Sequence, residues 1–124
     1  MQVNPNRYVL AIDLGSGGPK VGLVNQVGTV VARDFAHTPI NFLPDGGAEQ
    51  DPSEWWATTS STAKKVIQQS RVRNDEIIAI AVTSQWSVIV AVDENGEPLI
   101  NAISWLDTRG AAYSRRITSG FPNV

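Results

Sequence analysis

The chain has 124 residues and a formal net charge of −2, so it has one domain's length and lacks the basic excess of proteins that coat nucleic acid. It contains no cysteine and one histidine, which excludes disulfides, thiolate metal sites and multi-histidine metal sites. No apolar run approaches the roughly 20 residues that span a bilayer, and no signal-peptide pattern opens the chain, so we expect no membrane partner and a cytoplasmic location.

The first informative segment is an apolar run, residues 8–13, that predicts a buried central strand ending in a carboxylate. A glycine-rich loop follows, and residues 21–25 predict a second strand. Such loops occur in ordinary hairpins and in phosphate-binding loops, because glycine lets backbone N–H groups approach a phosphate. The segment is neither a P-loop nor a dinucleotide fingerprint, since the next segment is a predicted strand and not a helix.

The loop and its flanks carry groups suited to a nucleoside triphosphate. Asp13, at the end of the strand, is placed to hold a magnesium ion through water. The Ser16 hydroxyl can donate to a phosphate oxygen, and Lys20 supplies a mobile positive charge. The glycines that would open the loop backbone to phosphate are Gly15, Gly17 and Gly18. The structural alternatives are a carboxylate that caps the turn, a flexible hairpin and a solvated lysine.

The middle of the chain predicts a meander followed by a helix. Residues 26–28 predict a turn, residues 29–35 a third, β-branched strand, and residues 36–50 a loop with prolines and glycines. A helix is predicted over residues 52–70, with Asp51 as its N-cap and proline at its first position. Its apolar residues recur at helical spacing and predict one buried face: Trp55, Trp56, Thr59, Ala63, Val66 and Ile67.

A second apolar run, residues 77–83, predicts another buried strand. Because a helix precedes it, we expect a right-handed crossover that places this strand parallel to the first. After a polar break, residues 88–93 predict a strand, residues 94–97 a turn and residues 99–105 an extended segment that pairs back.

The last predicted element is a helix near the end of the chain. Asp107 or Thr108 is expected to cap it, and it should run to about Ser119.

The whole pattern, an α/β arrangement of three strands, a helix and a fourth strand, resembles the ribonuclease-H-like fold of the actin and hexokinase superfamily. Three segments are similar to the FGGY family of carbohydrate kinases: residues 47–56 to its acidic helix-opening segment, residues 83–85 to its sugar loop, and residues 102–109 to its Trp-x-Asp-x-Arg segment. The resemblance covers residues 8–116 and implies a β-β-β-α-β unit with a mixed sheet, part of an incomplete N-terminal lobe.

This resemblance implies a carbohydrate kinase, an enzyme that transfers a phosphoryl group from ATP, with Mg²⁺, to a sugar or polyol hydroxyl. Asp13 would act in the magnesium and phosphate shell, and Gly15, Ser16, Gly17, Gly18 and Lys20 would bind the phosphates. Gln85, Trp86, Trp105, Asp107 and Arg109 would contact the sugar, since an indole stacks on a sugar's C–H face and an amide bonds hydroxyls. A core anchor at Trp105 and a structural ion pair of Asp107 with Arg109 are the alternatives.

The resemblance also shows departures and missing parts. Gly17-Gly18-Pro19 loses a hydroxyl of the family's hairpin, and Pro19 removes a backbone donor. Trp86-Ser87 stands where glycerol kinases carry Arg-Glu and xylulose kinases carry Met-His, so neither substrate is assumed. The family's general base, second phosphate segment and adenine segment lie beyond the matched region. We therefore expect residues 1–124 to be the N-terminal part of the first kinase domain, with the second domain absent and the remainder of the kinase as partner, and to be inactive alone.

Two other functions remain as alternatives. One is a stand-alone ribonuclease-H-like module that binds nucleotide or sugar without catalysis. The other is a nuclease, which needs clustered carboxylates for two metals, whereas only Asp13 is well placed. Cut off from a larger lobe, the domain should expose apolar surface near the sheet edge and residues 88–105, which predicts self-association into a homo-oligomer.

Overall fold

The computed structural model describes residues 6–120, which divide into two units. The first unit combines residues 6–39 with 52–86, and the second combines residues 40–51 with 87–120. None of the helices within the described range is long and apolar enough to cross a membrane.

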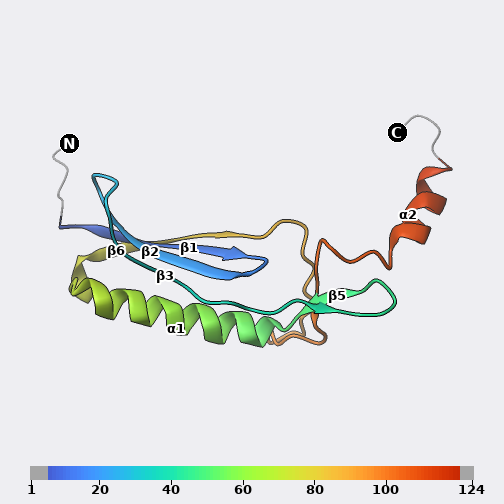
Figure 1. The fold of residues 1–124 in the computed structure, drawn as a ribbon, viewed down its shortest axis with the longest axis horizontal. Helices are drawn as coiled ribbons and strands as arrows, with labels where there is room; N and C mark the ends of the chain where they lie inside the picture. The colour runs from blue at the N-terminus through green and yellow to red at the C-terminus, as the bar shows by residue number, and fades with distance from the viewer. Residues whose placement is uncertain (1–5, 121–124) are drawn as a thin grey trace. The chain divides into compact units, whose positions relative to one another are not determined.

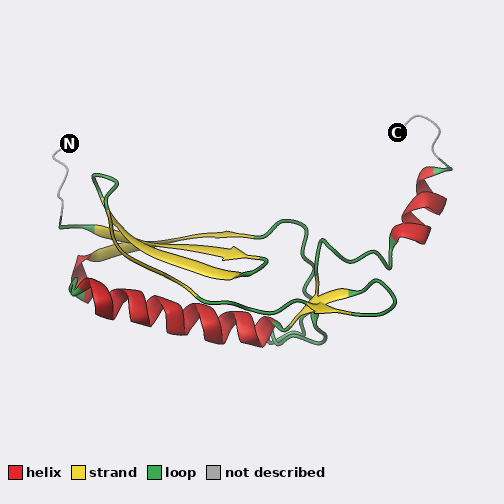
Figure 2. Cartoon of the chain, viewed as in Figure 1, coloured by secondary structure: helices red, strands yellow, loops and turns green. Residues whose placement is uncertain are grey.

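The first unit is a four-stranded sheet with one long helix beside it (Figures 1 and 2). Its sheet order is β3-β2-β1-β6, with antiparallel pairs β3–β2 and β2–β1 and a parallel pair β1–β6. The predicted meander, crossover and parallel fourth strand are therefore confirmed. The elements are β1 (Tyr8–Gly15), β2 (Gly18–Asn25), β3 (Val30–Phe35), α1 (Pro52–Ser70), a short 3-10 helix η1 (Asn74–Glu76) and β6 (Ile77–Ser84).

The core of this unit lies between the sheet and α1. Leu10 and Leu23 are paired across β1 and β2, and both are buried together with Val21 and Val66. The helix packs chiefly against β2 and β3. The prediction that Trp56 belongs to the buried helix face is wrong, because its side chain is exposed. Trp56 lies about 100° around the helix axis from the partly buried Trp55, which places it outside the face that packs against the sheet.

The predicted burial of the fourth strand is also wrong. Every residue of β6 from Ile78 to Ser84 is exposed, although the strand has the apolar run of a central parallel strand. The reason is its place at the edge: β1 pairs with it on one side, and no described strand pairs with its other side. Because α1 lies under β2 and β3, it leaves β6 uncovered as well.

The second unit contains a small antiparallel sheet of order β4-β5-β7. Two of its strands lie in the region predicted as loop, and no regular strand forms over residues 88–93, where only the isolated bridges Ile89–Ile103 and Val92–Pro98 occur. The predicted turn after Asp93 is present, because Asp93 Oδ1 accepts hydrogen bonds from Asn95 N and Glu97 N. The elements are β4 (Asn41–Phe42), β5 (Ala48–Gln50), β7 (Ala102–Ile103) and α2 (Ala111–Thr118).

The last helix begins later than predicted. Its N-cap is Gly110, and neither Asp107 nor Thr108 caps it. Both side chains are engaged elsewhere: Asp107 accepts the Ala48 N–H, and the Thr108 hydroxyl donates to the Gly46 carbonyl. Long-range partners therefore replaced the local capping interaction that the sequence pattern indicates.

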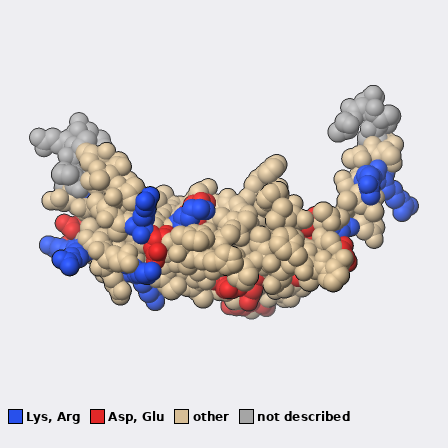
Figure 3. Space-filling view, in the orientation of Figure 1, with Lys and Arg blue, Asp and Glu red and all other residues tan. Residues whose placement is uncertain are grey.

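Ion pairs connect some surface elements, and Figure 3 shows separate small groups of basic and acidic side chains on a mostly uncharged face. Lys65 on α1 pairs with Asp34 on β3 at 2.7 Å. This contact fastens the helix to the β3 edge of the sheet.

Candidate functional site

The tip of the β1–β2 hairpin is fixed by its backbone. Gly15 and Gly18 form the last pair, so only Ser16 and Gly17 make the loop. Gly18 has a φ of 126°, and a Cβ there would lie 2.0 Å from the Ala36 carbonyl oxygen. No other residue fits this position without moving the neighbouring backbone. A Cβ at Gly17, in contrast, would meet nothing within 4 Å, so the loop's outer side is open.

The segment after β3 braces the back of this hairpin. Ala36 N donates to the Pro19 carbonyl at 3.2 Å, and Thr38 N donates to the Gly17 carbonyl at 3.1 Å. In a strand the N–H and C=O of one residue point to the same side. The donor that Pro19 lacks would therefore face this bracing segment and not the open side of the loop. The two bonds make the hairpin a supported turn, unlike the flexible hairpin that is the structural alternative.

Asp13 and Lys20 face each other across the hairpin. Lys20 Nζ lies 3.1 Å from Asp13 Oδ2, and the two side chains are 60% and 45% exposed for Lys20 and Asp13. The ammonium group also lies over Gly15, where a Cβ would approach it to 2.8 Å. Glycine at this position thus lets the lysine fold back toward the loop. Both charges remain accessible to a ligand.

These residues fit the phosphates of a nucleotide and a weakly held magnesium ion. Mg²⁺ commonly keeps several waters and takes one or two carboxylates together with substrate phosphates, and Asp13 is one exposed carboxylate beside an open glycine loop. Among residues 6–120 no group of three or more histidine, cysteine and acidic side chains could hold a metal by itself. The site is thus suited to a metal that arrives with a phosphate.

The sheet face that carries Asp13 is hollow. Side chains alternate along a strand, so Ala11 and Asp13 lie on the face opposite the buried Leu10. A concavity of about 740 Å³ lies on this face, where Gly22 and Ala81 leave space beside Ala11. Asp13 pairs with Thr83 where the parallel strands β1 and β6 end, and ligands of α/β sheets gather at such carboxyl ends.

The chain after β6 stays close to the end of β1. Gln85 N donates to the Leu14 carbonyl at 2.8 Å, which holds the predicted sugar loop beside the hairpin strand. Trp86 follows with 85% of its surface exposed. Ser87 then has a φ of 51°, a left-handed conformation that is uncommon for residues other than glycine and asparagine. The first unit thus brings together Asp13, Lys20 and the backbone of Gln85.

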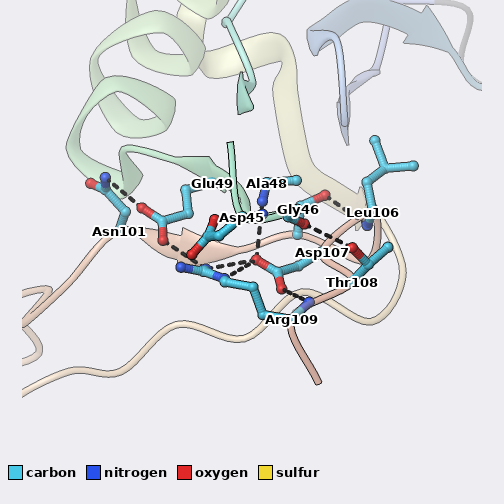
Figure 4. Close-up of polar contacts among 11 residues, drawn as sticks. Asp45, Gly46, Ala48, Glu49, Asn101, Leu106, Asp107, Thr108 and Arg109 are labelled. Atoms are coloured by element: carbon cyan, nitrogen blue, oxygen red, sulfur yellow. Dashed lines mark hydrogen bonds and ion pairs between the residues drawn. The ribbon is translucent and has the colours of Figure 1, made fainter. Parts of the chain in front are cut away.

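In the second unit, Asp107 and Arg109 belong to a dense polar network (Figure 4). Asp107 Oδ2 accepts Ala48 N at 3.0 Å and Arg109 Nε at 2.9 Å. Arg109 Nη2 also pairs with Glu49 Oε1 at 2.7 Å, and Asn101 Nδ2 donates to Glu49 Oε2 at 3.1 Å. The network therefore connects the β5 strand, the residue before β7 and the turn before α2.

The contacts within this network favour the charged forms of its side chains. The Arg109 guanidinium and the Ala48 N–H lower the pKa of Asp107 to about 2, and its side chain is only 6% exposed. Hydrogen bonds from Arg109 and Asn101 lower the pKa of Glu49, and both carboxylates raise the pKa of Arg109. The geometry matches the structural ion pair that was the alternative for Asp107 and Arg109. The two side chains and Glu49 also line a hollow of about 490 Å³.

Trp105 precedes this network in a turn and is more than half exposed. The core-anchor alternative therefore does not describe it. Sequence reasoning singled out Asp107 and Arg109 but missed Glu49, which pairs with Arg109, and Asn101, which donates to Glu49. Glu49 lies 60 residues before Arg109 in the chain, so no local spacing in the sequence indicates that the two side chains pair. A prediction that residues 48–50 form a strand would have been needed to identify Glu49.

Comparisons with known proteins agree with this architecture. Residues 8–122 match the model of the FGGY family of carbohydrate kinases, N-terminal domain. A xylulose kinase of Staphylococcus epidermidis is 36% identical over 109 residues, covering 88% of this chain and 22% of the relative. A glycerol kinase of Parabacteroides distasonis is 36% identical over 117 residues, covering 92% of this chain and 23% of the relative. The chain thus spans less than a quarter of the length of these relatives.

Solved structures show the same fold. The gluconate kinase of Lactobacillus acidophilus superposes with a TM-score of 0.83 at 23% identity, over 92% of this chain and 23% of that one. The xylulose kinase of Rhodospirillum rubrum gives a TM-score of 0.82 at 24% identity, over 94% and 24% of the two chains. The predicted ribonuclease-H-like fold, a β-β-β-α-β unit with a mixed sheet, is confirmed. The chain belongs to the FGGY family of carbohydrate kinases.

Proposed function

We propose that this chain is the N-terminal part of an enzyme that transfers a phosphoryl group from ATP to a hydroxyl of a sugar or polyol. The observation that carries the proposal is the braced glycine hairpin with an exposed carboxylate and ammonium at its base. Family membership adds the class of acceptor, since the family phosphorylates carbohydrates.

The proposed chemistry depends on positioning and charge. Phosphoryl transfer needs an in-line arrangement and neutralisation of the charge on the phosphate oxygens. The Gly15–Gly18 backbone and the Ser16 hydroxyl would bind a phosphate from the open side of the loop, and Lys20 would supply positive charge to it. Mg²⁺, when bound near Asp13 through water, would neutralise further negative charge on the phosphates.

The proposed sugar contacts come from two places. Gln85 and Trp86 follow β6 in the first unit, where the exposed indole offers a stacking surface for a sugar's C–H face. Trp105 offers a second exposed indole. Asp107 and Arg109 would act as positioning residues, because protein groups already bind both carboxylate oxygens of Asp107 and the Nε and Nη2 atoms of Arg109.

We further propose that the 124-residue chain alone binds phosphate ligands weakly and transfers no phosphoryl group. Its relatives are about four times as long, and positioned proton transfer and substrate orientation are lost when the groups that supply them are absent. In the second hypothesis, a binding module without catalysis, the chain would bind nucleotide or sugar fully on its own.

An NMR titration tests whether the β1–β2 hairpin binds phosphate. With MgATP and with inorganic pyrophosphate, the amides of Gly15, Ser16, Gly17, Gly18 and Lys20 should shift in the wild-type chain and shift far less in Lys20→Met. Lys64→Met is the matched control, since it removes an exposed lysine of α1 that lies outside the hairpin. No shift at the hairpin with either ligand would contradict the phosphate site.

Two activity measurements complete the test. A coupled assay of the 124-residue chain should show no sugar-dependent release of ADP, and release that Asp13→Ala abolishes would refute the dependence on a larger kinase. In a full-length kinase carrying this segment, Trp86→Ala should raise the KM for sugar far more than the KM for ATP. Trp56→Ala, another exposed indole, is the control, and equal effects of the two changes would remove Trp86 from the site.

A further inference from the structure

The end of β6 places a hydroxyl beside the carboxylate of Asp13. Asp13 on β1 pairs with Thr83 on β6, and the register shift in this pairing lies at the other end of β1, between Tyr8 and Val9. Residues that pair directly in neighbouring strands, which lie about 4.8 Å apart, point their side chains to the same face of the sheet. The Thr83 side chain therefore lies on the face that carries Asp13, and both residues line the same concavity.

The two neighbours of Asp13 in the sheet differ in charge. On the β2 side its partner is Lys20, whose Nζ lies 3.1 Å from Asp13 Oδ2. On the β6 side its partner is the uncharged Thr83. Within residues 6–120 no other group forms a hydrogen bond with the Thr83 hydroxyl, so its oxygen is available to a ligand. A divalent cation beside Asp13 is repelled by the ammonium group on one side and meets a neutral oxygen on the other.

A hydrated magnesium ion needs more than one oxygen acceptor. Mg²⁺ keeps several waters when it binds through one carboxylate and substrate phosphates, and the hydrogens of those waters need acceptors. In the row of paired residues Phe35, Lys20, Asp13 and Thr83, only Asp13 and Thr83 have side-chain oxygens. A threonine hydroxyl accepts hydrogen bonds with its lone pairs and donates one of its own. Thr83 is therefore suited to bind a metal-bound water next to Asp13.

We propose that the Thr83 hydroxyl accepts a hydrogen bond from a water of the Mg²⁺ ion that Asp13 holds, so that the ion lies on the β6 side of Asp13. Lys20, on the β2 side, then stays available to the phosphates. The two cations thus have separate places, and Asp13 lies between them. This inference rests on the proposed function and adds to it a residue that binds the water shell of the metal ion.

Manganese in place of magnesium reports the position of the ion. Mn²⁺ prefers the same oxygen ligands, and its unpaired electrons broaden the NMR signals of nearby nuclei steeply with distance. With Mn²⁺ and inorganic pyrophosphate, the amides of Thr83 and Ser84 should broaden more than those of Lys20 and Val21 in the 124-residue chain. Asp13→Asn should remove most of this broadening, which distinguishes the ion from manganese at other carboxylates. Stronger broadening at Lys20 and Val21 than at Thr83 and Ser84 would overturn the proposal.

Two substitutions test the hydroxyl itself. Valine has the shape of threonine without the hydroxyl and is equally suited to a strand. Thr83→Val should therefore raise the dissociation constant for Mn²⁺, measured from the broadening in the presence of pyrophosphate, about threefold to tenfold. Thr83→Ser, which keeps a hydroxyl, should stay within about twofold of the wild type.

Thr29→Val is the matched control for these variants. Thr29 is also exposed, but it lies in the β2–β3 turn, and Asn25, whose N–H donates to the Thr29 carbonyl, pairs with Tyr8 at the start of β1. This variant should bind Mn²⁺ as the wild type does, and circular dichroism verifies that each variant is folded. An unchanged constant in Thr83→Val, with binding lost in Asp13→Asn, would overturn this inference alone. No broadening near the hairpin of the wild type would overturn the phosphate site and this inference together.

Discussion

The hairpin of the first unit and the polar network of the second unit both contain an acidic and a basic side chain, but they use them in opposite ways. In the hairpin the backbone is fixed by glycine and by two bonds from the segment after β3, and Asp13 and Lys20 stay exposed. In the network the charges themselves fix the backbone, because Asp107 and Arg109 connect strands and a turn. An ion pair whose charges remain accessible beside a preformed loop can bind a ligand. An ion pair whose hydrogen-bonding atoms are already bound by other protein groups stabilises the fold instead.

The largest expected effect is on the backbone of the hairpin. Gly18→Ala should lower the free energy of unfolding by about 3 kcal/mol or more, because the new Cβ meets backbone atoms and the residue keeps a strained φ. Gly17→Ala, whose Cβ would lie in open space, should cost less than about 1 kcal/mol. Urea unfolding followed by circular dichroism measures both. Equal losses would show that the bracing segment does not fix the hairpin.

The next effect is local and concerns the network. Asp107→Ala leaves the Ala48 N–H and the Arg109 guanidinium without their acceptor, so hydrogen exchange of the Ala48 amide should rise about tenfold or more. Asp75→Asn removes the partner of Arg73 in an exposed ion pair and should leave exchange in the second unit unchanged. If Ala48 stays as protected in Asp107→Ala as in the wild type, the network does not hold β5.

A pH dependence follows from the same network. Folding lowers the pKa of Asp107 from 3.8 to about 2 and lowers that of Glu49 from 4.5. Between these values the unfolded chain binds more protons, so the stability from both carboxylates is complete above about pH 4.5 and is lost as pH falls toward 2. Asp107→Asn should flatten the loss of Ala48 protection over this window, while Asp13→Asn should not.

The smallest expected effect on stability is at the exposed pair. Asp13→Asn and Lys20→Met should each change the free energy of unfolding by roughly 0–1 kcal/mol, because solvent screens charges with this exposure. In a full-length kinase carrying this segment, Asp13→Ala should instead lower kcat strongly and change the KM for sugar less. A large loss of stability in Asp13→Asn would place this pair with the network, as a structural contact.

The sequence alone predicted the elements whose conformation depends on nearby residues in the chain or on a clear hydrophobic period. The apolar run of β1, the glycine turn and the helical spacing of α1 all have local causes, so their bounds were close to those observed. Exposed apolar surface near a sheet edge was predicted, but not that β6 forms this edge, because an apolar run looks the same in a central strand and in an edge strand.

The short strands β4, β5 and β7 escaped prediction for a different reason. Two or three residues are too few to establish a hydrophobic period. The strands pair because Glu49, Asp107 and Arg109 come together although some 60 residues of chain separate them. The same contacts removed Asp107 from its predicted place as a helix cap. For the candidate site, the sequence indicated the residue types at the hairpin, while the bonds that brace it from Ala36 and Thr38 had no sequence signal.

The exposed indoles have a consequence for spectroscopy. Trp56, Trp86 and Trp105 all lie open to water in the folded chain, so their emission in the native state should already be close to that of indole in aqueous solution. Unfolding would then change the fluorescence of these three indoles little, and quenchers such as acrylamide would reach them without denaturant. Any blue shift on adding a ligand or raising the protein concentration would report that a surface has been covered, which makes these side chains sensors of association rather than of folding.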